Sequence, residues 1–176
     1  MNIRRASSLR IAASVVFAVV AGTASSAIAP STQAPDFSLH AMSGPNMRLQ
    51  DQRGRVVMVN FWATWCAPCQ QEMPQLNRLY QKYRSSGFVL LGVNVDVSRE
   101  VLQRTQNERD LNWRSWWDGP GGPIATRWGV TGLPAVYLLD HRGVVRFESA
   151  GAPDFEDLEK RIENLVREAK ADGGGK

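Results

Sequence analysis

Two long apolar runs dominate the hydrophobic pattern of the chain, at positions 56–61 and 88–95. Neither run alternates between apolar and polar side chains, which is typical of strands that are covered on both faces. Helices are predicted between and after them, over residues 67–85 and 98–108, the second with Ser98 as its N-cap. Both strands are therefore expected in the centre of a sheet.

The last part of the chain shows a different pattern. Residues 135–139 and 144–147 are largely apolar and flank the turn sequence Asp-His-Arg-Gly, which predicts an antiparallel hairpin. A final amphipathic helix is predicted over residues 155–169. Strand, helix, strand, helix, hairpin and helix in this order predict an α/β sandwich around a mixed sheet.

The N-terminal segment has the three parts of a secretory signal peptide. Residues 1–10 carry three arginines and no acid, residues 11–21 are apolar, and residues 22–29 are rich in Ala, Ser and Thr. We predict cleavage after Ala27. The alternative is an uncleaved membrane anchor, because no charge interrupts residues 11–35. The expected location is periplasmic or secreted, with membrane contact only if the segment stays attached.

Composition limits the rest of the molecule to one domain. About 149 residues follow the predicted leader, enough for one hydrophobic core. The formal net charge is +4, but three of the 21 basic residues lie in the leader, so 18 basic and 17 acidic residues remain. This balance gives no support for nucleic-acid binding. We expect a linker over residues 28–33, the domain over 34–170 and a disordered tail over 171–176.

The chain has two cysteines, Cys66 and Cys69, separated by two residues. A crosslink this short removes little entropy from the unfolded chain, so a structural role explains it poorly. Reversible storage of two electrons suits the pair better. Because Cys66 falls where a strand ends and a helix begins, unpaired N–H groups should stabilise its thiolate. We therefore predict Cys66 as an exposed nucleophile and Cys69 as a more buried resolving thiol.

Metal and haem sites find little support. A zinc site would need both cysteines together with His40 and His141, which are more simply explained as loop and turn residues. Gln70 stands where a c-type haem attachment motif would carry histidine. No cofactor is expected, while Cu(I) binding by the two thiolates stays open as an alternative.

The run Phe-Trp-Ala-Thr-Trp-Cys-Ala-Pro-Cys at residues 61–69, with Glu-Met-Pro at 72–74 and Thr-Gly-Leu-Pro at 131–134, resembles the TlpA/ResA-like branch of the thioredoxin superfamily. The resemblance extends from about residue 34 through the final helix. It implies a thioredoxin-like fold, with a central mixed sheet flanked by helices on both faces. It also implies that Pro134 follows a cis peptide beside the cysteines, which leaves the main chain of Leu133 free to pair with substrate.

Glu72 is a candidate for proton transfer. It lies within the same helical arc as Cys69, close to the sulfurs. There its carboxyl could exchange the proton that moves when the disulfide opens, especially if burial raises its pKa. Plain thioredoxin uses an Asp in the preceding strand, where this chain has Asn60, which cannot titrate. The alternative is that Glu72 only stabilises the helix through its dipole.

Several aromatic and acidic residues near the motifs have two readings. Trp65, directly before the nucleophile, is the best candidate for substrate contact. The later tryptophans are expected in the core rather than in a substrate groove; they are Trp113, Trp116, Trp117 and Trp128. Asp96 follows an apolar strand and either caps the next turn or faces the active site.

Together these features predict an extracytoplasmic thiol:disulfide oxidoreductase acting on protein disulfides. No His or Lys lies next to the cysteines to stabilise the thiolate strongly, which favours a reductant. The resemblance implies cytochrome c maturation or a similar reduction, with a membrane thiol reductase as electron donor. A disulfide-forming oxidase and a Cu(I) metallochaperone are the alternatives. A peroxiredoxin is disfavoured because Trp65 and Pro68 flank the thiols in the thioredoxin manner.

Overall fold

The structure is a computed structural model that describes residues 27–39, 46–108, 111–119 and 121–173. The predicted leader through residue 26, His40 and residues 174–176 of the predicted tail lie outside the described residues. Among the described residues, no helix has the length and apolar character needed to cross a membrane.

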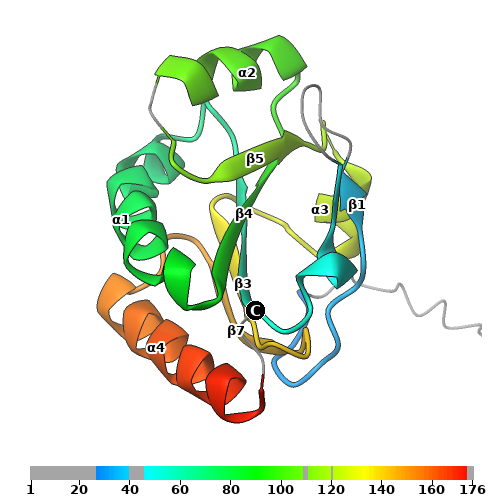
Figure 1. The fold of residues 1–176 in the computed structure, drawn as a ribbon. Coiled ribbons are helices and arrows are strands. Elements are labelled where there is room, and N and C mark those ends of the chain that lie inside the picture. The colour runs from blue at the N-terminus through cyan, green and yellow to red at the C-terminus, as the bar shows by residue number, and fades with distance from the viewer. Residues whose placement is uncertain (1–26, 40–45, 109–110, 120, 174–176) are drawn as a thin grey trace, which may run out of the picture.

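A mixed sheet with the strand order β5-β4-β3-β6-β7 forms the centre of the domain (Figure 1). Strands β3, β4 and β5 run parallel to one another, whereas β6 pairs antiparallel with both β3 and β7. Their bounds are β3 (Val56–Trp62), β4 (Phe88–Asn94), β5 (Arg114–Trp117), β6 (Ala135–Leu139) and β7 (Val145–Ala150). Every residue of β3 and β4 is buried, so the prediction of two central strands covered on both faces is confirmed.

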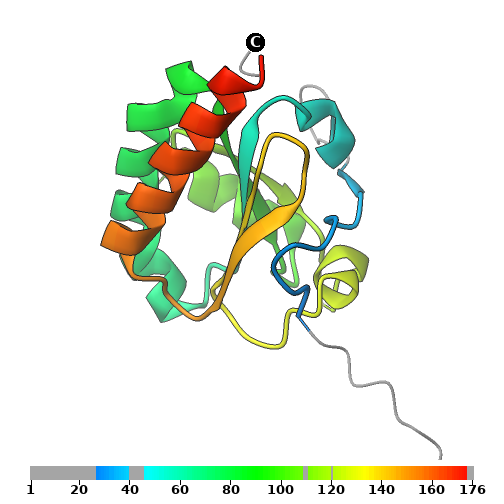
Figure 2. The same cartoon turned by 90° about the horizontal axis from the view of Figure 1, so that it is seen from below.

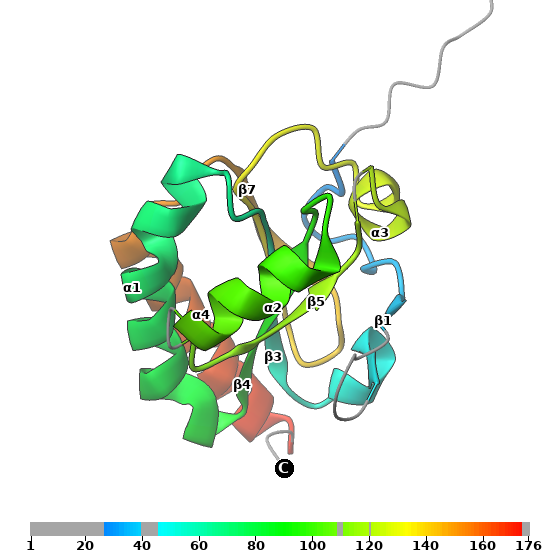
Figure 3. The ribbon, with the colours of Figure 1, turned by 90° about the horizontal axis from the view of Figure 1, so that it is seen from above.

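Helices and short strands cover the two faces of this sheet (Figure 2). One face is covered by α1 (Ala67–Tyr83) and α4 (Phe155–Ala171). The other is covered by α3 (Pro123–Arg127) and by β1 (Ser38–Leu39), β2 (Met47–Arg48) and the 3-10 helix η1 (Leu49–Gln52). Helix α2 (Arg99–Glu108) lies against β5 (Figure 3), and a second 3-10 helix, η2 (Arg84–Ser86), follows α1. The predicted α/β sandwich is confirmed.

The alternation of β3 divides the core into two clusters. Its even-numbered apolar residues pack under α1 and α4, and its odd-numbered residues pack toward α3. Asn60 belongs to the even-numbered set and is 1% exposed, so a polar side chain is buried beneath the helix that carries the cysteines.

Two tryptophans fix the end of β3 against the edge of the sheet. Trp62 donates from Nε1 to Oγ of Ser115 on β5 (2.7 Å) and meets Trp113 edge-on at 6.1 Å between ring centroids. Gly92 of β4 lies beneath them, and a Cβ at this position would come within 2.5 Å of both the Ser115 hydroxyl and the Trp113 ring. A glycine is therefore needed for this close approach.

The segment predicted as a linker is part of the folded domain. Ser31 donates from its N–H to the Val145 carbonyl (2.7 Å), and the Val145 N–H donates to the Thr32 carbonyl (2.9 Å). Ile28 packs against the core cluster on the α3 side. The prediction was wrong because β7 is an edge strand whose start offers main-chain groups to this segment.

The structure confirms one predicted helix end and corrects another. Ser98 caps α2, as predicted, with its hydroxyl oxygen accepting from the Val101 N–H (3.4 Å). Helix α4 continues to Ala171, which therefore belongs to the helix and not to the predicted tail. The elements β1, β2, β5 and α3 were not predicted, because they are at most five residues long and too short for a periodic pattern.

Candidate active site

The two cysteines lie at the start of α1, as predicted. Cys66 is the N-cap residue, with extended backbone angles, and its Sγ accepts a hydrogen bond from the Cys69 N–H (3.2 Å). Pro68 occupies the first turn, where its missing N–H costs no hydrogen bond. Cys66 and Cys69 form a disulfide. The N–H groups of the first turn are thus placed to stabilise a thiolate at Cys66.

The exposure of Cys66 differs from the prediction. Cys66 is 5% exposed and Cys69 is 1% exposed, so both are buried, although Cys66 is the more accessible of the two. The reason is that the disulfide holds the Cys66 side chain over the first helical turn, where it joins the core cluster of Trp62 and Met73. Cys66 is therefore a buried N-cap sulfur in the oxidised protein rather than an exposed one.

Asp96 holds the loop that leads to Cys66. Its carboxylate accepts hydrogen bonds from the Thr64 N–H (3.0 and 3.2 Å) and from the Thr64 hydroxyl (3.0 Å). Asn94 orients it, because the Asn94 amide donates to the carboxylate (2.9 Å) and accepts from the Asp96 N–H (3.1 Å). Asp96 is 1% exposed. Of the two interpretations of Asp96, the structure supports the one in which its carboxylate faces the active-site loop.

The loop presents Trp65 to solvent. Trp65 is 67% exposed. It lies between the anchored Thr64 and Cys66 in the sequence. On the helix side, Gln70 donates from Nε2 to the Thr64 carbonyl. The loop is therefore held from both sides while its aromatic side chain stays free for contact with another molecule.

Glu72 is buried one turn beyond Cys69. It is 2% exposed, and neither carboxylate oxygen has a hydrogen-bond partner among the described residues. Burial raises the pKa of Glu72 from 4.5 to about 7, and the nearby Asn60 side chain opposes this shift. Asn60 Oδ1 is likewise buried without a partner. A carboxyl group whose pKa is raised to about 7 thus lies one helical turn beyond Cys69, and such a pKa suits proton transfer near neutral pH.

The segment before β6 contains the proline that was predicted to follow a cis peptide. The Leu133–Pro134 peptide is cis, which confirms the prediction. The Pro134 carbonyl accepts from the Gly151 N–H (2.8 Å), whereas the main chain of Leu133 forms no hydrogen bond with any described residue. Leu133 packs against the core cluster that contains the cysteines. Its main chain thus keeps the unpaired groups that the predicted pairing with an extended substrate would need.

The tryptophans divide between core and site. Trp113, Trp116 and Trp128 are buried, as predicted. Trp117 is half-buried: its Nε1 donates to the Asp96 carbonyl (2.7 Å), and the Arg99 guanidinium lies 4.8 Å from its ring centroid. Trp117 therefore supports the turn that carries Asp96 rather than the core alone.

His141 lies in the hairpin turn, as predicted. Its Nε2 is 3.2 Å from a carboxylate oxygen of Asp172, just after α4. The roles of Thr64, Asn94 and Ser115 were not predicted from the sequence, although the ends of neighbouring parallel strands lie side by side. That rule points to Thr64 after β3 and Asp96 after β4 as neighbours.

Comparison with known proteins agrees with this geometry. Residues 30–148 match the model of the AhpC/TSA family. The chain is 34% identical over 143 residues to thiol-disulfide oxidoreductase ResA of Geobacillus kaustophilus, covering 81% of this chain and 82% of that protein. The chain belongs to the AhpC/TSA family. Within this thioredoxin-like family its relatives are ResA-type proteins, and the chain is a thiol-disulfide oxidoreductase.

Other relatives place the chain in the same group. It is 34% identical over 134 residues to the thioredoxin-like protein YneN of Bacillus subtilis, covering 74% of this chain and 77% of that one. A crystal structure of a putative thiol:disulfide interchange protein DsbE from Chlorobium tepidum superimposes with a TM-score of 0.75 at 32% identity, covering 80% of this chain and 99% of that one. The predicted thioredoxin-like fold is confirmed.

Proposed function

We propose that the protein works outside the cytoplasm and reduces specific protein disulfides, of the kind that cytochrome c maturation requires. The observation that carries this proposal is the Cys66–Cys69 disulfide at the N-terminus of α1, with the buried Glu72 one turn further on. The signal-like pattern of residues 1–29 supports the compartment, and the absence of His or Lys beside the cysteines supports the direction.

The reaction is an exchange of one disulfide for another. The Cys66 thiolate attacks a sulfur of the substrate disulfide, forms a mixed disulfide and releases the first substrate thiolate. The Cys69 thiolate then attacks Cys66 Sγ, which releases the second substrate thiolate and forms the disulfide seen in the structure. Two electrons pass to the substrate, which takes up two protons.

Glu72 supplies the proton acceptor for the second step. Cys69 is 1% exposed, so its thiol cannot lose a proton directly to bulk water. Glu72 follows one turn later on the same helical face, and its pKa of about 7 lets it accept this proton and pass it on. The reverse transfer accompanies reduction of the enzyme by its donor, for which we propose a membrane thiol reductase.

The reduction potential tests the direction of this proposal. Equilibration with glutathione should give a value near that of thioredoxin, about −270 mV, and a value near −120 mV would identify a disulfide-forming oxidase instead. Substrates should be trapped as mixed disulfides by the Cys69→Ala variant in the extracytoplasmic fraction. If Cys66→Ser keeps its biological activity and Cys69→Ser loses Cu(I) binding, the protein is a metallochaperone and the reductase proposal is wrong.

A further inference from the structure

Asn60 and Glu72 are two buried polar residues that meet where β3 packs against α1. The even-numbered residues of β3 point toward α1 and α4, and Asn60 is the polar member of this set, next to the apolar Met58 and Trp62. Both Asn60 and Glu72 are almost fully buried. Asn60 is also the side chain whose hydrogen bonding lowers the pKa of Glu72. The two side chains are therefore neighbours in a largely apolar layer.

Three oxygen atoms of this pair have no other partner. Oδ1 of Asn60 and both carboxylate oxygens of Glu72 are buried, and none of them forms a hydrogen bond of standard geometry with a described residue. A buried oxygen that lacks a hydrogen bond destabilises the fold unless another polar group lies within reach. For each of these two side chains, the polar group within reach is the other one.

Charged side chains contribute nothing to this environment. Burial and Asn60 are the two influences on the pKa of Glu72 from the described part of the chain. Strands β3 and β4 carry no titratable side chain, and the titratable groups at the start of α1 are the two cysteines. Where α4 packs against α1, the charged groups pair with one another; they are Arg78, Lys82 and Glu159. The proton affinity of Glu72 therefore depends on Asn60 more than on any charge.

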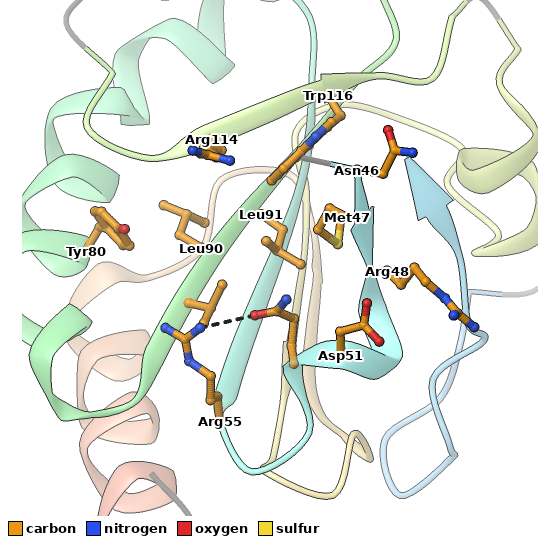
Figure 4. Close-up of a pocket in the computed structure, with 12 residues that line it drawn as sticks. Asn46, Met47, Arg48, Asp51, Arg55, Tyr80, Leu90, Leu91, Arg114 and Trp116 are labelled. Carbon is orange, nitrogen blue, oxygen red and sulfur yellow. Dashed lines mark hydrogen bonds between the residues drawn. The ribbon is translucent and has the colours of Figure 1, made fainter. Parts of the chain in front are cut away.

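Two cavities beside the sheet stop short of this pair. One, of about 280 Å³, lies next to β4, and α1 contributes Tyr80 to its wall, well beyond Glu72 along the helix (Figure 4). The other, of about 270 Å³, lies next to α3, and its wall contains no residue of α1. Water in either cavity cannot solvate the Glu72 carboxylate, so Asn60 has to take the place of solvent.

An amide can pair with both protonation states of a carboxyl group. Its N–H donates to the ionised form, and its oxygen accepts from the O–H of the neutral form once the amide has turned over. The bond to the charged form is the stronger one, which agrees with the lower pKa that Asn60 gives Glu72. An Asp at this position, as in plain thioredoxin, would be ionised near neutral pH and would repel a second carboxylate.

We propose that Asn60 is a positioning residue for proton transfer, which holds the Glu72 carboxyl one turn from Cys69 and stabilises its ionised form. The inference rests on the proposed role of Glu72 as proton acceptor. In the second exchange step the bond between Cys66 Sγ and the substrate sulfur breaks, the bond between Cys66 Sγ and Cys69 Sγ forms, and the substrate leaves as a thiolate. The Cys69 proton passes to Glu72, and the Asn60 amide turns its oxygen toward the new O–H.

The first test measures the pKa of Glu72 in the oxidised mature protein from its carboxyl carbon-13 signal. Asn60→Leu removes both polar atoms at similar volume and should raise this pKa by about one unit, because the ionised form loses its donor. Met58→Leu lies on the same face of β3, is equally buried and changes no polar group, so it should leave the pKa unchanged. A pKa in Asn60→Leu within about 0.3 units of the wild type would overturn the proposal.

Asn60→Asp keeps a polar side chain and provides the same measurement if the leucine variant does not fold. Two neighbouring carboxyl groups titrate as a coupled pair, so the higher of their two apparent pKa values should exceed that of wild-type Glu72 by about one unit or more. Titration of Glu72 at its wild-type pKa in this variant would show that the two side chains do not interact, and the proposal would be wrong.

The second test follows the two exchange steps separately. Reduced protein is mixed with one equivalent of Ellman's reagent, whose coloured thiolate is released once by the attack of Cys66 and again by the attack of Cys69. At about pH 7 the second release should be roughly fivefold slower in Asn60→Leu than in the wild type, and it should recover near about pH 9, because the ionised fraction of Glu72 falls from about half to about a tenth. Met58→Leu should match the wild type. Equal second phases in Asn60→Leu and the wild type would contradict the proposal.

Glu72→Gln separates this inference from the proposed function. If Glu72 accepts the proton, Glu72→Gln slows the second release, and adding Asn60→Leu should change it further by less than about twofold, because Asn60 acts through Glu72. A further loss of about fivefold would show that Asn60 acts by another route and would overturn the inference alone. A wild-type second release in Glu72→Gln would instead refute Glu72 as the proton acceptor, and the inference with it.

Discussion

The carboxylate of Asp96 accepts hydrogen bonds from both the main-chain N–H and the hydroxyl of Thr64, each at 3.0 Å. This contact ties the end of β4 to the loop after β3, two residues before Cys66. The position of the nucleophile therefore depends on a buried carboxylate that belongs to a different strand.

Asp96→Ala should lower the free energy of unfolding by about 3 kcal/mol, because it leaves the buried Asn94 amide and the half-buried Thr64 N–H without acceptors. The rate of disulfide exchange should fall as well, since the loop before Cys66 loses its anchor. Chemical denaturation and insulin reduction measure the two effects. Glu163→Ala, at an exposed carboxylate on α4, is the control and should change neither. Wild-type stability of Asp96→Ala would show that the anchor is unimportant.

Glu72 should make the stability of the oxidised protein depend on pH. Its pKa is about 7 in the folded protein against 4.5 unfolded, because burial penalises the charged form. The stabilisation from the protonated form is complete below about pH 4.5 and is lost as pH rises through about 7, a loss on the order of 3 kcal/mol. The free energy of unfolding, measured from pH 4 to 9, should fall over this window.

Glu72→Gln is the matched variant for this experiment, since its neutral side chain cannot titrate. The difference in unfolding free energy between wild type and Glu72→Gln should therefore change with pH between about 4.5 and 7. Parallel curves for the two proteins would mean that Glu72 is already ionised in the folded state. The same variant should slow the exchange step in which Cys69 loses its proton.

Trp65→Ala should weaken substrate binding while leaving the fold intact. Trp65 is 67% exposed, so its removal should change the free energy of unfolding by less than about 0.5 kcal/mol. We expect a higher KM for protein disulfides and an unchanged rate with a small disulfide such as oxidised glutathione. Trp128→Ala provides the contrast, since this residue is fully buried and its loss should cost about 3–5 kcal/mol. An unchanged KM in Trp65→Ala would remove Trp65 from the substrate site.

The parts of the fold that local sequence determines were predicted well. The apolar runs of β3 and β4, and the face of α1 that carries Cys69 and Glu72, follow from the side-chain periods of strands and helices. The short strand β5 was missed because its stability comes from pairing with β4 and from contacts such as that of Trp62 with Ser115, 53 residues apart. Such contacts leave no periodic pattern.

The candidate site, like the fold, was predicted where short motifs determine it and missed where tertiary packing does. The places of Cys66, Cys69 and Pro134 follow from short motifs, whereas the burial of Cys66 and the unpaired oxygens of Glu72 depend on the packing of α1 over Asn60. The function of Asp96 was left open because its partner Thr64 is 32 residues away. The rule that neighbouring parallel strands end at the same edge of a sheet would have predicted that Thr64 and Asp96 lie close together.

Capture of a substrate by single-cysteine variants tests the account most directly. Reduced Cys69→Ala and Cys66→Ala are incubated with insulin, and mixed disulfides are identified by non-reducing electrophoresis and mass spectrometry. Because Cys66 is the N-cap residue of α1 and Cys69 is the more buried, Cys69→Ala should form a stable mixed disulfide through Cys66 while Cys66→Ala forms almost none. Equal capture through Cys69, or no capture by either variant, would contradict the assignment of nucleophile and resolving thiol.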